Sequence, residues 1–172
     1  MEIPNSIKKI VIDGANVVQF THNRNDEPEI KNLIPLFKWL EEVNVQHRIQ
    51  IEIIVDSTLR RVIDKKDQYE YLLRYGVLKQ VPATTTADAF IVKMVEKYQK
   101  EILVISNDLF RDFSELKADT SRIQYGFMIL FDSFELIPLK FSLRNKRSRK
   151  KNQKLSPRTL ISEINQEISN NL

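Results

Sequence analysis

The chain has 172 residues, of which 42% are hydrophobic and 29% are charged, so it can form one globular domain with a substantial core. It has no cysteine, which excludes disulfides, cysteine-ligated zinc and cysteine nucleophiles. No apolar run is long enough to cross a membrane, and the first residues have no signal-peptide pattern. We therefore expect a cytoplasmic protein without a membrane partner.

The positive charge is concentrated in the last part of the chain. Residues 141–172 hold eight Lys or Arg and two Glu, whereas residues 1–140 hold 19 basic and 21 acidic side chains. Such a basic segment indicates a polyanionic partner, most often nucleic acid. The alternative is a tail that only aids solubility.

Apolar periodicity predicts alternating strands and helices. The first strand, residues 8–13, is a run of consecutive apolar and β-branched residues, which is typical of a parallel strand covered on both faces. Pro28 opens a helix that continues to about residue 43, and Pro35 should kink or divide this helix. The remaining expected elements are strands at 49–56, 77–81, 101–105, 125–131 and 134–139 and helices at 64–75, 87–97 and 109–116, with Gly76 ending one helix and Thr86 capping the next. This order predicts a three-layer α/β sandwich with a central, mostly parallel sheet and a late antiparallel hairpin.

Acidic side chains follow the predicted strands at the edge where the carboxyl ends of the strands meet. Asp13 and Asp56 end strands, Asp88 lies in the first turn of a helix, and Asp108 follows the strand at 101–105. Asp112 comes four residues later and would share a helix face with Asp108, where two negative charges repel each other. Acids gathered in one crevice need a cation, and carboxylate and amide oxygens suit Mg²⁺ or Mn²⁺.

Each of these residues also has a purely structural interpretation. Asp88 and Asp108 could stabilise helix N-termini, Asp112 could be a solvated helix residue, and Asp56 could be a turn or cap residue. Asn16 could orient an acid, bind phosphate through its amide, or form a local hydrogen bond in a turn. The structural interpretations fit the acids singly but fit them poorly as a set, because the parallel strands of this fold end on one shared rim.

Four motifs in this order resemble the NYN domain of the PIN-like nuclease superfamily, and most closely its Regnase-type endoribonucleases. They are Val-Ile-Asp-Gly-Ala-Asn at 11–16, Val-Asp-Ser-Thr-Leu-Arg at 55–60, Ala-Asp-Ala-Phe-Ile-Val-Lys at 87–93 and Ser-Asn-Asp-Leu-Phe-Arg-Asp-Phe at 106–113. The resemblance spans about residues 7–139 and implies a PIN-like fold and RNA cleavage with a divalent metal. The family's metal-site acids match Asp13, Asp88, Asp108 and Asp112, and its active-site asparagine matches Asn16.

The chain departs from the family pattern in two respects. Animal members carry two adjacent acids at the third motif, where this chain has Ala87 followed by Asp88. A CCCH zinc finger cannot form without cysteine, so RNA targeting must come from another part of the protein.

The resulting hypothesis is a Mg²⁺- or Mn²⁺-dependent endoribonuclease that cleaves single-stranded or looped RNA. The residues expected to position substrate or metal ligands are Asp56, Arg60, Arg61, Lys93, Ser106, Asn107 and Arg111. A non-catalytic RNA-binding or scaffold protein of the same fold is the alternative, which Ala87 favours. A DNA-directed nuclease also stays open, because carboxylate-metal chemistry does not read the 2′-hydroxyl. A haloacid-dehalogenase-type phosphatase would need an acid where this chain has Ala15.

The sequence predicts a nuclease domain at 1–141, a basic linker at 142–155 and a short amphipathic helix at 156–172. Ser156 and Pro157 are a suitable N-cap and first helical residue, and the apolar residues Leu160, Ile161, Ile164 and Ile168 recur at helical spacing. We expect the linker to contact RNA phosphates. The helix should dock on this domain, on a second copy or on a protein partner.

Overall fold

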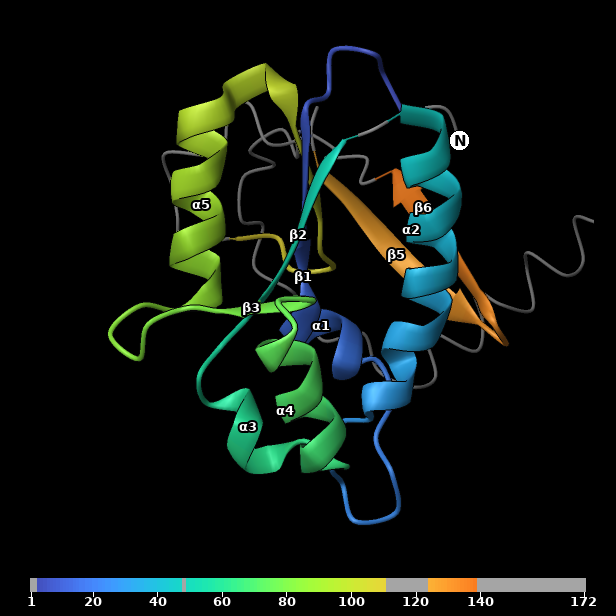
Figure 1. The fold of residues 1–172 in the computed structure, drawn as a ribbon, viewed down its shortest axis with the longest axis vertical. Coiled ribbons are helices and arrows are strands. Elements are labelled where there is room, and N and C mark those ends of the chain that lie inside the picture. Colours follow the sequence, from blue (N-terminus) through green and yellow to red (C-terminus); the bar gives the residue numbers. More distant parts are fainter. Residues whose placement is uncertain (1–2, 48, 111–123, 139–172) are drawn as a thin grey trace, which may run out of the picture. The chain divides into compact units, whose positions relative to one another are not determined.

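The computed structural model describes residues 3–47, 49–110 and 124–138, which form a six-stranded sheet flanked by helices (Figure 1). The strands are β1 (Lys9–Asp13), β2 (Gln50–Val55), β3 (Leu78–Gln80), β4 (Ile102–Ile105), β5 (Gln124–Leu130) and β6 (Ser133–Pro138). The helices are α1 (Gly14–Val18), α2 (Leu33–His47), α3 (Leu59–Val62), α4 (Lys66–Arg74) and α5 (Ala87–Tyr98), with 3-10 turns η1 (Ile30–Asn32) and η2 (Gln99–Glu101). The chain divides into two units, residues 1–140 and 141–172, and every described residue belongs to the first. No described helix is both long enough and apolar enough to span a membrane.

The sheet has the order β3-β2-β1-β4-β5-β6 and is parallel except for the antiparallel pair β5-β6. In β1, Asp13 lies opposite Ile54 of β2, and Ile12 lies opposite Ile105 of β4. The carboxyl ends of these three central strands therefore share one edge, as the sequence predicts. This edge is where ligands bind in open parallel sheets.

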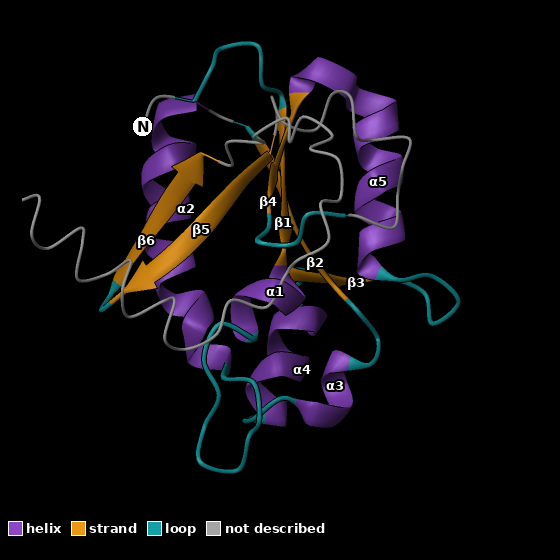
Figure 2. Cartoon of the chain, turned by 180° about the vertical axis from the view of Figure 1, so that it is seen from behind, coloured by secondary structure: helices purple, strands orange, loops and turns teal. Residues whose placement is uncertain are grey.

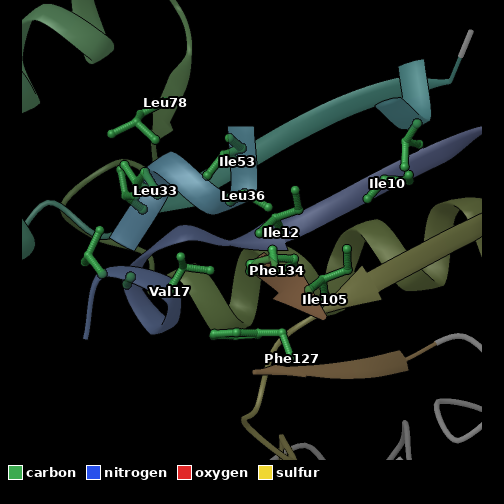
Figure 3. Packing of buried hydrophobic residues seen from close by; sticks show 14 of the residues in the cluster. Ile10, Ile12, Val17, Leu33, Leu36, Ile53, Leu78, Ile105, Phe127 and Phe134 are labelled. Carbon is green, nitrogen blue, oxygen red and sulfur yellow. The ribbon is translucent and has the colours of Figure 1, made fainter. Parts of the chain in front are cut away.

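Helices cover the sheet on both faces, so the fold has three layers (Figures 1 and 2). On one face, Ile10 and Ile12 of β1 belong to a cluster that includes Leu33 and Leu36 of α2, as Figure 3 shows. On the other face, Val11 of β1 belongs to a second cluster with α5. Successive residues of β1 thus alternate between two apolar layers, which explains the unbroken apolar run in its sequence.

Two predicted helix ends, at Thr86 and at Gly76, are confirmed. The hydroxyl of Thr86 caps α5 by accepting a hydrogen bond from the Ala89 N–H at 3.2 Å. After α4, Gly76 has a left-handed φ of +70°, and its N–H bonds to the Leu73 carbonyl while the next N–H, of Val77, bonds to the Leu72 carbonyl. This is a Schellman motif, which glycine favours because it has no Cβ.

Two predicted helices differ from the structure, and one observed helix is not predicted. The helix expected from Pro28 begins at Leu33, after the separate turn η1, so Pro35 lies in the first turn of α2, where a missing N–H costs nothing. The four-residue helix α3 is not predicted, because it is too short to show a periodic pattern. Leu109 and Phe110 have no helical structure, and the rest of the helix predicted at 109–116 lies outside the described residues.

The late hairpin is confirmed. Leu130 of β5 pairs with Ser133 of β6, so the connecting turn is Phe131-Asp132, one residue earlier than the predicted junction at Asp132-Ser133. Trp39 of α2 packs on Phe134 of β6 with ring centroids 5.7 Å apart. The predicted linker at 142–155 and helix at 156–172 lie outside the described residues.

Candidate active site

Strand β1 runs directly into α1 at the carboxyl edge of the sheet (Figure 1). Asp13 is the buried acid at this junction. Its side chain is 4% exposed and caps α1, because Oδ1 accepts a hydrogen bond from the Asn16 N–H at 3.0 Å. The next residue must be glycine. A Cβ on Gly14 would lie 2.7 Å from Ile53 Cγ2 and 2.9 Å from Val55 Cγ1, so only glycine lets α1 start this close to β2.

Ser106 connects Asp13 to the loop after β4. Its hydroxyl donates to Asp13 Oδ2 at 2.9 Å and accepts from the Asp108 N–H at 3.0 Å. The side chain of Ser106 is fully buried, whereas Asp108 is exposed. The hydroxyl therefore sets the position of Asp108 relative to Asp13, although the two acids are 95 residues apart in the sequence.

Asn16 and Asn107 connect the same two loops a second time. Asn16 Oδ1 accepts a hydrogen bond from the Asn107 N–H at 3.0 Å. The Asn107 side chain is held on β5: its Nδ2 donates to the Phe127 carbonyl at 3.1 Å, and its Oδ1 accepts from the Phe127 N–H at 2.8 Å. The amide of Asn107 thus fixes the loop after β4 on the sheet.

Gln124, the first residue of β5, is a site residue that sequence reasoning missed. It is 3% exposed, and its Nε2 donates to the carbonyl oxygens of both Ser106, at 3.2 Å, and Asp108. The only signal in the sequence is a polar residue at the start of an apolar strand, which also fits an ordinary strand end. Its contacts make Gln124 a positioning residue for Asp108.

Asp13, Asp88 and Asp108, the acids of the rim at the carboxyl edge of the sheet, influence one another electrostatically. The pKa of Asp13 rises from its usual 3.8 to about 6, chiefly because burial disfavours the charged form. Hydrogen bonds from Asn16 and Ser106 oppose this rise in pKa, and the negative charges of Asp88 and Asp108 add to it. A cation beside these carboxylates would relieve that repulsion.

Carboxylate oxygens are ligands that Mg²⁺ and Mn²⁺ prefer, so the donor type of Asp13, Asp88 and Asp108 fits the expected metal. Within residues 3–47, 49–110 and 124–138, however, no three His, Cys, Asp or Glu side chains form a group that could hold a metal ion. Asp112, the fourth predicted ligand, lies outside the described residues, as does Arg111. The described acids alone are therefore not a preformed metal centre.

Asp56 lies beside the start of α5. Its Oδ1 accepts a hydrogen bond from the Ala87 N–H at 2.8 Å, so the carboxylate that ends β2 caps the helix that carries Asp88. Ala87 itself is buried. The structure thus places an acid from another strand at the helix end where the third motif of this chain has alanine.

The predicted basic residues differ in their surroundings. Arg60 forms an ion pair with Glu70 on α4, and Arg61 and Lys93 are exposed. Among the described residues, Arg61 and Lys93 have no ion-pair partner, so their charges are available at the surface.

The sheet order, the acidic rim and the ordered motifs together define a PIN-like nuclease domain. Residues 6–154 match the model of the Zc3h12a-like Ribonuclease NYN domain, and the chain belongs to this family. The fold is also similar to two solved structures of the nuclear protein-only RNase P 2 (PRORP2) of Arabidopsis thaliana, at 20% and 19% sequence identity, each with a TM-score of 0.56. Each match covers 77% of this chain but only 30% of the RNase P chain. A search of curated protein sequences gave no significant match.

Proposed function

We propose that this chain is a divalent-metal-dependent endoribonuclease that cleaves single-stranded or looped RNA. Membership of a ribonuclease NYN family supports the reaction class. The observation that carries the proposal is the buried carboxylate of Asp13, which two further acids, Asp88 and Asp108, influence at the carboxyl edge of the sheet. Buried acids with strongly raised pKa values are concentrated at functional sites.

Asp13, Asp88 and Asp108 would hold Mg²⁺ or Mn²⁺, and Asp112 would complete the ligand set. Such an ion, when bound, supplies an activated water and stabilises the leaving oxygen during displacement at phosphorus. Ser106 and Asn16 together fix the orientation of the Asp13 carboxylate. The Ser106 hydroxyl donates to Oδ2, and the Asn16 N–H donates to Oδ1.

Asn16 is suited to contact the scissile phosphate. Its Oδ1 is held by the Asn107 N–H, which fixes the orientation of the amide group. Among the described residues, its Nδ2 has no hydrogen-bond partner, so this donor can serve a phosphate oxygen. Arg61, Lys93 and Arg111 would contribute positive charge for the RNA backbone.

We further propose that Asp56 takes the place of the missing acid at the third motif. Its carboxylate lies at the first turn of α5, one residue from Asp88, where Ala87 contributes no ligand. Substituting Asp56 by Asn keeps an acceptor for the Ala87 N–H but removes the charge. If Asp56 serves the metal, the Asn variant should need more Mg²⁺ for half-maximal cleavage; if Asp56 only caps α5, the Mg²⁺ requirement should not change.

The test of the whole proposal is cleavage of a labelled RNA with Mg²⁺ or Mn²⁺ and with EDTA. Asp13→Asn should abolish metal-dependent cleavage, whereas Asp132→Asn, which removes a 90% exposed acid in the β5-β6 turn, should retain it. Cleavage that persists in EDTA, or in the Asp13→Asn variant, would refute the mechanism. A DNA of matched sequence, assayed in parallel, separates RNA-specific from general nuclease activity.

The alternative is an RNA-binding protein that keeps the fold without the chemistry. The observation in its favour is that the acids within residues 3–47, 49–110 and 124–138 form no metal-binding group. Calorimetry distinguishes the two functions, because a non-catalytic protein would retain RNA affinity while showing no heat of Mg²⁺ or Mn²⁺ binding.

The basic segment at 142–155 is proposed to contact RNA phosphates. Residues 141–172 hold a net positive charge, whereas the preceding residues hold slightly more acids than bases. Deleting residues 142–172 should leave metal binding intact, weaken RNA binding and flatten the dependence of affinity on salt. Unchanged affinity and salt slope in the truncated protein would assign the segment to solubility alone.

A further inference from the structure

A groove of about 560 Å³ lies between α4 and the segment that runs from η1 into α2. Its lining is largely apolar and includes Leu33 and Phe37 of α2 and Tyr71 of α4. Tyr71 is 57% exposed, and Ile34 in the same lining is 53% exposed. We call this surface the Tyr71 groove. Apolar side chains exposed together in a concave surface mark a binding site.

The aromatic rings beside the groove are arranged for stacking. Tyr71 and Tyr75 lie one helical turn apart, and their ring centroids are 4.4 Å from each other with a 38° angle between the planes. Tyr75 is 65% exposed, so both rings are accessible to a ligand in solution. Exposed aromatic side chains are the usual stacking platform for the bases of single-stranded nucleic acids.

Positive charge surrounds the same surface. Lys31 and Lys65 line the groove, while Lys66 and Arg74 lie in the first and last turns of α4. Glu29 pairs with Lys31 at 2.7 Å and also interacts electrostatically with Lys65. Among the described residues, Lys66 and Arg74 have no ion-pair partner. The lining contains one acid, Asp67. Exposed tyrosines beside the cations Lys66 and Arg74 are complementary to a single-stranded polyanion with bases.

Hydrogen bonds join the groove to the candidate active site. The buried Asn32 of η1 donates to the carbonyl of Val18, the last residue of α1, at 2.9 Å. Asp64, just before α4, accepts from the Ile30 N–H at 2.8 Å, so both walls of the groove are tied together. Helix α1 starts directly after Asp13 and has five residues, a rise of about 8 Å. The groove is therefore connected through the fold to the helix that begins at the candidate active site.

We infer that the Tyr71 groove binds the single-stranded RNA that flanks the cleavage site. Bases stack on Tyr71 and Tyr75, and phosphates contact Lys66 and Arg74. This inference rests on the proposed ribonuclease function, because it names a second contact for the same substrate. It explains how a domain with an acidic rim can hold RNA without depending on charge alone.

The experiment measures binding of the full chain to a labelled single-stranded RNA of about 12 nucleotides by fluorescence anisotropy in EDTA. Tyr71→Ala should raise Kd about 5- to 100-fold, because it removes a stacking platform. Tyr71→Phe keeps the ring and should stay within about twofold of wild type. Phe131→Ala, which removes a fully exposed ring in the β5-β6 turn, is the matched control and should leave Kd unchanged.

Two results would overturn the inference. One is an unchanged Kd for Tyr71→Ala, or no binding of single-stranded RNA by the wild type. The other is a wild type that is a dimer in solution and a Tyr71→Ala variant that is a monomer with the same RNA affinity. This result would assign the groove to contact with a second copy of the chain. Mg²⁺-dependent cleavage by the wild type is assayed separately. If the wild type cleaves RNA but Tyr71→Ala does not change Kd, only the inference about the groove is refuted. If Tyr71→Ala raises Kd but the wild type does not cleave RNA, only the proposed enzymatic function is refuted.

Discussion

Asp13→Asn should stabilise the metal-free protein at neutral pH while abolishing cleavage. In the folded state the pKa of Asp13 is about 6, above its usual 3.8, so the folded protein binds more protons than the unfolded chain between these values. The stability associated with protonated Asp13 is therefore complete below about pH 4 and is lost as the pH rises through about 6. At about 1.4 kcal/mol per pK unit, ionised Asp13 costs about 3 kcal/mol of folding free energy above that range.

Asn keeps both contacts, because its Oδ1 can accept from the Asn16 N–H and its Nδ2 can donate to the Ser106 hydroxyl. The second bond is reversed in direction, since in the wild type the Ser106 hydroxyl is the donor. Urea unfolding in EDTA from pH 4 to pH 8 measures the effect. The difference in unfolding free energy between Asp13→Asn and wild type should grow by about 3 kcal/mol over this range. Asp132→Asn, in an exposed turn, controls for a general change of charge and should show no such growth.

Metal provides the second half of this test. Mg²⁺ or Mn²⁺ should stabilise the wild type at pH 8, because a ligand that binds only the folded state raises the unfolding free energy, and should leave Asp13→Asn nearly unchanged. A difference between the two proteins that stays constant from pH 4 to pH 8 would refute the assignment of the raised pKa to Asp13.

Three further substitutions test the fold and the site. Gly14→Ala should lower the unfolding free energy by about 1–3 kcal/mol in urea denaturation, because its Cβ would overlap β2 side chains. Gln124→Glu should slow cleavage about 10- to 100-fold with little change in RNA affinity, since a carboxylate would face the two carbonyl oxygens that Gln124 Nε2 now binds. Tyr69→Phe should leave stability unchanged or raise it by up to about 1 kcal/mol at pH 7, because among the described residues its buried hydroxyl has no partner. Burial raises the pKa of Tyr69 to about 12, so wild-type stability should fall relative to Tyr69→Phe as the pH rises above about 10.

The sheet and the position of Asp13 could be predicted because both depend on local pattern. An apolar run that ends in an acid, such as Ile10–Asp13, is a buried parallel strand whose last residue must reach the carboxyl edge. The caps at Thr86 and Gly76 are similarly local, since each uses the geometry of its own helix end. Three of the four motifs that indicate the family lie at strand ends and the fourth lies at the start of α5, so the family could also be predicted from the sequence.

The connections between the loops could not be predicted in the same way. Ser106 and Gln124 contact acids or carbonyls that are distant in the sequence or on another strand, and no spacing rule gives these partners. Asn107 looks in the sequence like a substrate-binding amide, yet both polar atoms of its side chain bind the backbone of Phe127. A polar side chain in a motif can contact a ligand or can hold the loop that carries the ligand-binding residues. Only its tertiary contacts show which of the two it does.

The distribution of charge gives a reason for the two RNA-binding surfaces proposed above. Residues 1–140 hold 19 basic and 21 acidic side chains, and acids gather at the rim, so Coulombic attraction to RNA is weak in this part of the chain. Stacking on Tyr71 does not depend on counterion release, whereas contacts from the basic segment do. The two sources of affinity are therefore separable by salt. Tyr71→Ala should weaken binding by a similar factor at low and high salt, and deletion of residues 142–172 should matter chiefly at low salt.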